Sequence, residues 1–117
     1  MPYIGISTSK VLTEEQKNAL AAALGEKISL IPNKIEANLM VDISDGHAMY
    51  LGSVKRELAY VDLRCYDSVE FSYKKAYTEA ALEALHQVTG LAKDCMYLNY
   101  TEYPVWGSKG TLKGIDQ

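Results

Sequence analysis

The chemically most unusual feature of the sequence is the proline that directly follows Met1. If Met1 is removed, Pro2 carries a free secondary amine at the head of an apolar, β-branched stretch. An amine held in an apolar pocket has a lowered pKa, because burial disfavours its charged form. Such an amine can act as a general base near neutral pH. The alternatives are a second-position proline without any role, or a retained Met1, which would make the Pro2 nitrogen an amide.

The other reactive side chains do not form a recognisable catalytic set. His47 and His86 are far apart in the sequence, and neither has a histidine or cysteine partner at metal-ligand spacing. Asp42, Asp45 and His47 could form a metal cluster, but a solvated turn after a strand is the better interpretation. Residues 107–110 lack the Gly-Lys-Ser/Thr ending of a phosphate-binding loop. We therefore expect no metal site and no cofactor.

Composition narrows the class of partners. The 117 residues carry 12 basic and 15 acidic side chains, a formal charge of -3, which leaves no basic surface for nucleic acid. No apolar run reaches the roughly 18 residues that span a membrane, and no charged leader precedes an apolar stretch. Cys65 and Cys95 form no C-x-x-C pair. These features predict one soluble domain over residues 1–117 in a reducing, cytoplasmic compartment.

The first half of the chain shows a strand, a helix and a second strand. Residues 3–8 are apolar and β-branched, as is typical of a strand. A helix is expected from about 13 to about 30, and the T-x-x-Q pattern of Thr13 and Gln16 predicts a capping box at its start. A second strand is expected over 38–45. The helix should bury one apolar stripe, made of Leu20, Leu24, Ile28 and Ile31.

The second half repeats this order. Residues 47–53 predict a linking loop or a short edge piece, and 58–66 predict a third strand. Ser72 could cap a second helix, and Gly90 is a typical left-handed stop at its end. The buried face of this helix is expected to contain Tyr73, Ala76, Tyr77, Ala80, Ala84, Leu85 and Val88.

A fourth strand over residues 96–102, broken by Pro104, completes the pattern, whereas the glycine-rich tail at 107–114 is ambiguous. Two β-α-β units predict an α+β fold, with a four-stranded sheet and two helices on one face. So small a sheet leaves its other face and its edges uncovered. Self-association with cyclic symmetry is the simplest way to cover them.

Four short segments, taken in order and spacing, resemble one known family. They are Met-Pro-Tyr-Ile at 1–4, Met-Tyr-Leu-Gly-Ser at 49–53, Met-Tyr-Leu-Asn-Tyr at 96–100, and Trp106-Gly107. The sequence is similar here to the tautomerase superfamily, and specifically to the group like macrophage migration inhibitory factor and D-dopachrome tautomerase. The resemblance covers nearly the whole chain.

The resemblance implies a homotrimer whose protomers interconvert the keto and enol forms of a small α-keto acid, such as phenylpyruvate, without a cofactor. Pro2 would act first as the base and then as the acid. Lys34, which follows the first helix, would pair with the substrate carboxylate, and its charge would favour a neutral Pro2 amine. A solvated lysine after a helix is the alternative for Lys34.

The resemblance also implies roles for residues late in the chain. Tyr97 and Asn99 match a tyrosine and an asparagine that reach the site from a neighbouring subunit, and alternation puts both on one face of a strand. Tyr66 corresponds to an apolar residue that lines the pocket, and Trp106 to the aromatic that closes it. Tyr97 could instead be a core aromatic, and Trp106 could equally cover the edge of the trimer.

Two other functions stay open. The first is a binding or signalling protein that keeps the trimeric scaffold without a physiological reaction, as cytokine-like members of the family suggest. The second is dehalogenation or decarboxylation of an unsaturated acid by addition of water. Relatives with that chemistry generally need extra arginines, and this chain has only Arg56 and Arg64, so we rank it last.

Overall fold

The fold is built on a mixed β-sheet. In the computed structural model, which describes residues 1–114, four strands form this sheet in the order β2-β1-β5-β6. Strands β1 (Pro2–Thr8) and β5 (Ala59–Tyr66) are antiparallel neighbours at its centre. Strands β2 (Met40–Ser44) and β6 (Met96–Tyr103) form its edges and run parallel to β1 and β5, respectively. The predicted pairing of β-α-β units is confirmed.

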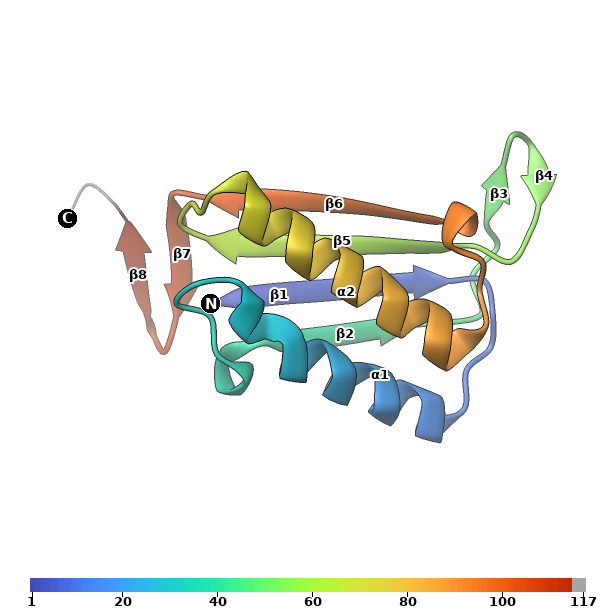
Figure 1. The fold of residues 1–117 in the computed structure, drawn as a ribbon, viewed down its shortest axis with the longest axis horizontal. Coiled ribbons are helices and arrows are strands. Elements are labelled where there is room, and N and C mark those ends of the chain that lie inside the picture. The colour runs from blue at the N-terminus through green and yellow to red at the C-terminus, as the bar shows by residue number, and fades with distance from the viewer. Residues whose placement is uncertain (115–117) are drawn as a thin grey trace.

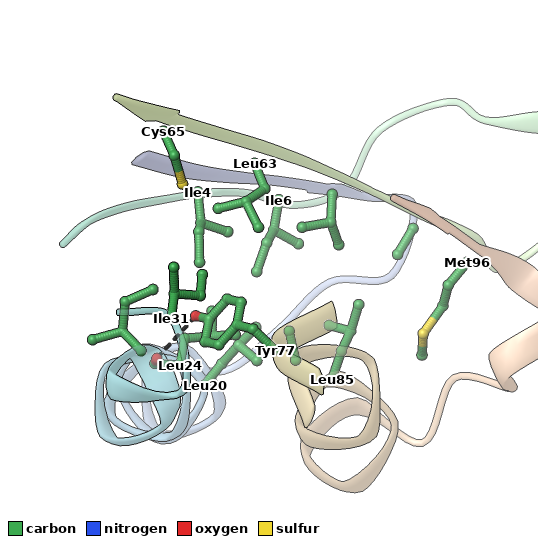
Figure 2. Packing of buried hydrophobic residues seen from close by; sticks show 14 of the residues in the cluster. Ile4, Ile6, Leu20, Leu24, Ile31, Leu63, Cys65, Tyr77, Leu85 and Met96 are labelled. Carbon is green, nitrogen blue, oxygen red and sulfur yellow. Dashed lines mark hydrogen bonds between the residues drawn. The ribbon is translucent and has the colours of Figure 1, made fainter. Parts of the chain in front are cut away.

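Helices α1 (Glu14–Lys27) and α2 (Phe71–Thr89) lie side by side on the same face of the sheet (Figure 1). The hydrophobic core fills the space between these two layers. Figure 2 shows Ile4, Ile6 and Leu63 pointing from the sheet toward the helices. Burial of this apolar surface is the main force that holds the helices on the sheet. The α+β fold expected from the sequence is therefore confirmed.

The start of α1 agrees with the prediction. The Thr13 hydroxyl accepts a hydrogen bond from the backbone N–H of Gln16 over 3.1 Å. The backbone N–H of Thr13 in turn donates to the Gln16 side-chain oxygen over 2.9 Å, which completes the capping box. A turn of 3-10 helix, Ile28–Leu30, extends the helix. The whole predicted stripe of Leu20, Leu24, Ile28 and Ile31 is buried.

Helix α2 departs from the prediction at its start. Its N-cap is Glu70, which makes no side-chain capping bond, so Ser72 lies within the first turn and the expected Ser72 cap is wrong. Tyr73 and Ala76 are exposed rather than buried. Gly90, with φ of 77°, ends the helix as predicted, in a conformation that glycine adopts without strain. The fully buried positions are Tyr77, Ala81, Leu85 and Thr89.

Short hairpins extend both ends of the sheet. Strands β3 (Tyr50–Leu51) and β4 (Val54–Lys55) pair where the sequence allows a loop or an edge piece. The ambiguous tail contains a second hairpin, of β7 (Val105–Ser108) and β8 (Thr111–Gly114). Figure 1 shows β7 and β8 at the end of the sheet where the N-terminus lies, and β3 and β4 at the opposite end. No helix within residues 1–114 is both long and apolar enough to cross a membrane.

Candidate active site

A cavity of about 500 Å³ opens where β1 begins. Its walls come from four segments that are distant in the sequence: Met1 to Tyr3, the approach to β2 at Asn38 and Met40, Arg64 of β5, and residues 106–109. Most of the lining is apolar, while the guanidinium of Arg64 and the side chain of Lys109 supply positive charge. The fold therefore builds a pocket around the proline that the sequence singles out.

Pro2 itself is buried at this end of the sheet. Its side chain is less than 2% exposed, and it pairs with Cys65 on β5. Met1 precedes it in the sequence, and while Met1 is retained the Pro2 nitrogen is an amide. The Met1 carbonyl accepts a hydrogen bond from the backbone N–H of Tyr66 over 3.3 Å, and the Ser108 hydroxyl lies 2.7 Å from the Met1 sulfur. Met1 is thus held between the end of β5 and the terminal hairpin.

The surroundings of the N-terminus favour a neutral amine. Burial lowers the pKa of the Met1 amino group, and the positive charge of Lys34 lowers it further; Cys65 opposes this shift in part, and Lys113 adds a smaller decrease. Lys34 is only 7% exposed, and its ammonium donates to the Tyr66 carbonyl over 2.8 Å. A fixed charge therefore lies close to the chain terminus. This electrostatic arrangement is the one that a nitrogen base requires.

The thiol below Pro2 is not a reactive nucleophile. Cys65 is 1% exposed, and burial raises the pKa of its thiol. The thiol form therefore predominates at neutral pH, and only the thiolate is nucleophilic. Cys65 is therefore not a candidate nucleophile, which leaves the N-terminal nitrogen and the charged groups around it as the candidate reactive groups.

The predicted site residues divide into two groups. Pro2 and Trp106 line the cavity. Lys34 and Tyr66 lie directly behind it, bonded to each other, and Tyr66 also bonds to Met1. Trp106 lies beside Tyr103, with the ring centroids 6.1 Å apart. The fold thus brings together, at one end of the sheet, four residues that the sequence separates widely.

Tyr97 and Asn99 form the second group and are not part of this cavity within the same chain. Tyr97 is opposite Tyr60 on β5, five positions from the Cys65 that pairs with Pro2. At about 3.3 Å per residue this separation is roughly 17 Å. Tyr97 is 63% exposed on the sheet face that the helices leave open. The Asn99 amide donates to the Tyr60 hydroxyl over 2.6 Å, on that same face.

Arg64 also lines the cavity, although the sequence did not single it out as a site residue. Arg64 is opposite Tyr3 in the β1–β5 pair and lies on the open face of the sheet. Its Nε and Nη2 both donate to Asp62 Oδ2, over 3.1 and 2.8 Å. This pairing with Arg64, followed by a bond from Asn99, lowers the pKa of the Asp62 carboxyl. The alternating pattern of β5 could have placed Arg64 on the same face of the strand as Tyr66. Its proximity to Pro2, however, follows only from the register in which β5 pairs with β1.

Solved structures share this fold over almost the full chain. An MIF2 from Leishmania major matches with a TM-score of 0.89 and 23% sequence identity, covering 97% of this chain and 97% of that chain. A structure described as Pt0534 inactivated by 2-oxo-3-pentynoate matches at 0.82 and 15% identity, over 92% and 93%. A fused 4-OT described as a symmetric trimer matches at 0.78 and 18%, over 87% and 85%.

These likenesses define the class of the fold. It is the α+β fold of the tautomerase superfamily. More particularly, the chain has the fold of macrophage migration inhibitory factor and MIF-like structures, as the resemblance in the sequence implies. No family model matches the sequence, and none of the curated proteins matches it.

Proposed function

We propose that this protein, once Met1 is removed, is a cofactor-independent keto–enol tautomerase that acts on a small α-keto or enol acid such as phenylpyruvate. The observation that carries the proposal is Pro2, buried at the wall of a largely apolar cavity with a fixed positive charge behind it. The fold supports this class, because tautomerase superfamily structures share it. The free cysteines agree with a reducing, cytoplasmic compartment.

In the proposed reaction, Pro2 is first the base and then the acid. Removal of Met1 turns the Pro2 amide into a secondary amine within the same desolvated surroundings. The neutral nitrogen takes a proton from the carbon beside the keto group, and the electron pair of the broken C–H bond forms the C=C bond of the enol. The nitrogen then returns the proton to the oxygen, so the step consumes no other reactant.

Lys34 contributes through its charge. A cation fixed behind the terminus opposes protonation of the amine, which keeps part of the nitrogen neutral near pH 7. Lys34 is also our sequence-based choice for the residue that pairs with the substrate carboxylate. For that contact its ammonium would exchange the Tyr66 carbonyl, 2.8 Å away, for an oxygen of the ligand.

We further propose that three chains assemble into a homotrimer. Strand β6 is an eight-residue edge strand, and it carries the exposed Tyr97. Exposed edges of this length are usually covered in native proteins. In a cyclic trimer, β6 of one chain would bring Tyr97 and Asn99 toward the Pro2 pocket of its neighbour. The match with a fused 4-OT described as a symmetric trimer supports this arrangement.

The test is turnover of phenylpyruvate by untagged protein whose intact mass shows that Met1 is absent. Pro2→Gly keeps a terminal amine but changes its basicity and geometry, so we expect turnover to fall by at least about tenfold, which is part of the roughly 10²- to 10⁴-fold that a general base contributes. Pro104→Gly, in the exposed bend between β6 and β7, is the matched control and should stay active. A Pro2→Gly trimer as active as the wild type would refute the mechanism. A processed wild-type trimer without any turnover would favour the binding-protein alternative.

A further inference from the structure

Arg64 is the cation that the Pro2 pocket presents to a ligand. Its side chain is 51% exposed and lines the cavity together with Pro2 and Trp106. Lys34, by contrast, is 7% exposed and is not among the residues that line the cavity. Its ammonium already donates a hydrogen bond to the backbone carbonyl of Tyr66. A carboxylate that enters the cavity therefore meets the Arg64 guanidinium without any rearrangement of the fold.

The guanidinium is held in place by a chain of hydrogen bonds along the open face of the sheet. Asp62 Oδ2 accepts from Nε and Nη2 of Arg64, and Asp62 Oδ1 accepts from the Asn99 amide over 2.9 Å. The Asn99 oxygen in turn accepts from the Thr101 hydroxyl over 2.6 Å. The guanidinium also lies over the Tyr3 ring in a cation–π contact, with Cζ 6.0 Å from the ring centroid. Arg64 is thus a pre-oriented group rather than a freely rotating surface charge.

This arrangement leaves donors free for a ligand. A guanidinium has five N–H groups in a fixed fork, and the Asp62 contacts use two of them, Nε–H and one Nη2–H, on the same edge. The remaining groups have the geometry for a carboxylate, which arginine binds more specifically than lysine does. Lys109, the other cation on the cavity wall, is exposed at the tip of the terminal hairpin, where its flexible side chain offers only a mobile charge.

We propose that Arg64 anchors the substrate carboxylate and that Asp62 is a positioning residue which orients Arg64. Trp106 and Met40, on the same cavity wall, would contact the apolar part of the acid. This inference rests on the proposed function and names how its substrate is recognised. The proposed site favours small carboxylic acids with an apolar body. It assigns the carboxylate to Arg64 on β5 in place of Lys34, whose role is then to lower the pKa of the N-terminal amine.

The test uses binding, which needs no turnover. Trp106 is the only tryptophan of the chain and lines the cavity, so its fluorescence reports occupancy. The ligands are 3-phenylpropionate and its uncharged amide, titrated into processed protein. Arg64→Gln should raise the Kd of the acid by about 10- to 100-fold, the range for loss of a charge-assisted bidentate contact. The Kd of the amide should change less than about twofold.

Further variants separate recognition from folding. Arg64→Lys should recover part of the affinity for the acid. If Arg64→Gln does not fold, Arg64→Lys still tests the role of the guanidinium, because it keeps the charge but not the bidentate geometry. Asp62→Asn should weaken acid binding by about three- to tenfold while leaving amide binding unchanged. Arg56→Gln is the control, because Arg56 lines a different pocket, away from Pro2, and it should leave both constants unchanged.

The outcomes distinguish the two proposals. Equal acid affinity in folded Arg64→Gln and wild type would overturn the anchor assignment, as would a wild type that binds the amide as well as the acid or binds neither. Acid binding that depends on Arg64, in a protein without turnover, would support the anchor and contradict the tautomerase. Turnover in a protein whose acid binding does not depend on Arg64 would support the tautomerase and contradict the anchor.

Discussion

The ammonium of Lys34 donates a hydrogen bond to the main-chain carbonyl of Tyr66 over 2.8 Å, inside the fold rather than at its surface. This bond ties the segment after helix α1 to the last residue of β5. It also fixes a positive charge beside the N-terminus, where the charge lowers the pKa of the amino group. The electrostatics of the candidate site thus depend on a contact between the two halves of the chain.

Neutralising Lys34 should shift the pH dependence of turnover. A base works only when deprotonated, so kcat/KM should rise with pH through the pKa of the Pro2 amine. In Lys34→Met the repulsion that lowers this pKa is lost, and the acid limb should move to higher pH. A pH profile of kcat/KM in processed protein measures the shift. Lys27→Met, on the exposed last turn of α1, is the control. If the acid limb of the kcat/KM profile does not move in folded Lys34→Met, the charge of Lys34 does not lower the pKa of the Pro2 amine.

Tyr77 joins the two helices, and its loss should weaken the core. Its side chain is fully buried, and its hydroxyl donates to the Leu24 carbonyl over 2.9 Å, as Figure 2 shows. We expect Tyr77→Phe to lower the free energy of unfolding by about 1 kcal/mol, the typical value of one hydrogen bond. Urea denaturation measures this change. Tyr73→Phe, one turn earlier and exposed, should be neutral; an equal loss in both variants would contradict the assignment.

The same tyrosine predicts a loss of stability at alkaline pH. Burial raises the pKa of Tyr77 above its usual value near 10. The folded state therefore holds this proton more tightly than the unfolded chain does. The resulting stabilisation is complete below about pH 10 and decreases as pH rises further. The difference in unfolding free energy between wild type and Tyr77→Phe should shrink above that pH; a constant difference would argue against burial as the cause.

The capping box of α1 should contribute measurably to stability. Thr13→Ala removes the acceptor for the Gln16 N–H, and we expect a loss of about 1 kcal/mol in the free energy of unfolding. Gln16→Ala removes the reciprocal bond to Thr13. Because the two bonds belong to one motif, the double variant should lose less than the sum. Thermal unfolding measures all three, with the exposed Thr111→Ala as control. Strict additivity would show that the two bonds act independently.

The sheet, the helices and their order were predictable because they are recorded in local patterns. The T-x-x-Q pattern and the apolar stripe from Leu20 to Ile31 predicted α1, and Gly90 predicted the end of α2. The buried face of α2 was predicted less well, because alanine is compatible with either side of a helix. The terminal segment stayed ambiguous in the sequence, because the strands of its hairpin do not pack on the core and so lack an alternating pattern.

The candidate site was predictable only in part. Pro2 and Trp106 were named from the sequence, and the fold places both on one cavity. Arg64 was missed because its place in the cavity follows from its pairing with Tyr3 across β1 and β5, which no local pattern records. The roles of Tyr97 and Asn99 stay predictions, because they depend on a neighbouring chain.

The sheet is nearly symmetric, since each half of the chain contributes a central strand and a parallel edge strand to it. In the second half of the chain, Ala59 is the first residue of the central strand β5, which is the position that Pro2 has in β1. The chain reaches Ala59 through a peptide bond from Leu58, so this second position has no amine. A free N-terminal amine exists only where a polypeptide begins, so a β-α-β unit that follows another in the same chain cannot carry one. The two halves thus share an architecture, but the amine on which the proposed function depends can lie in only one of them.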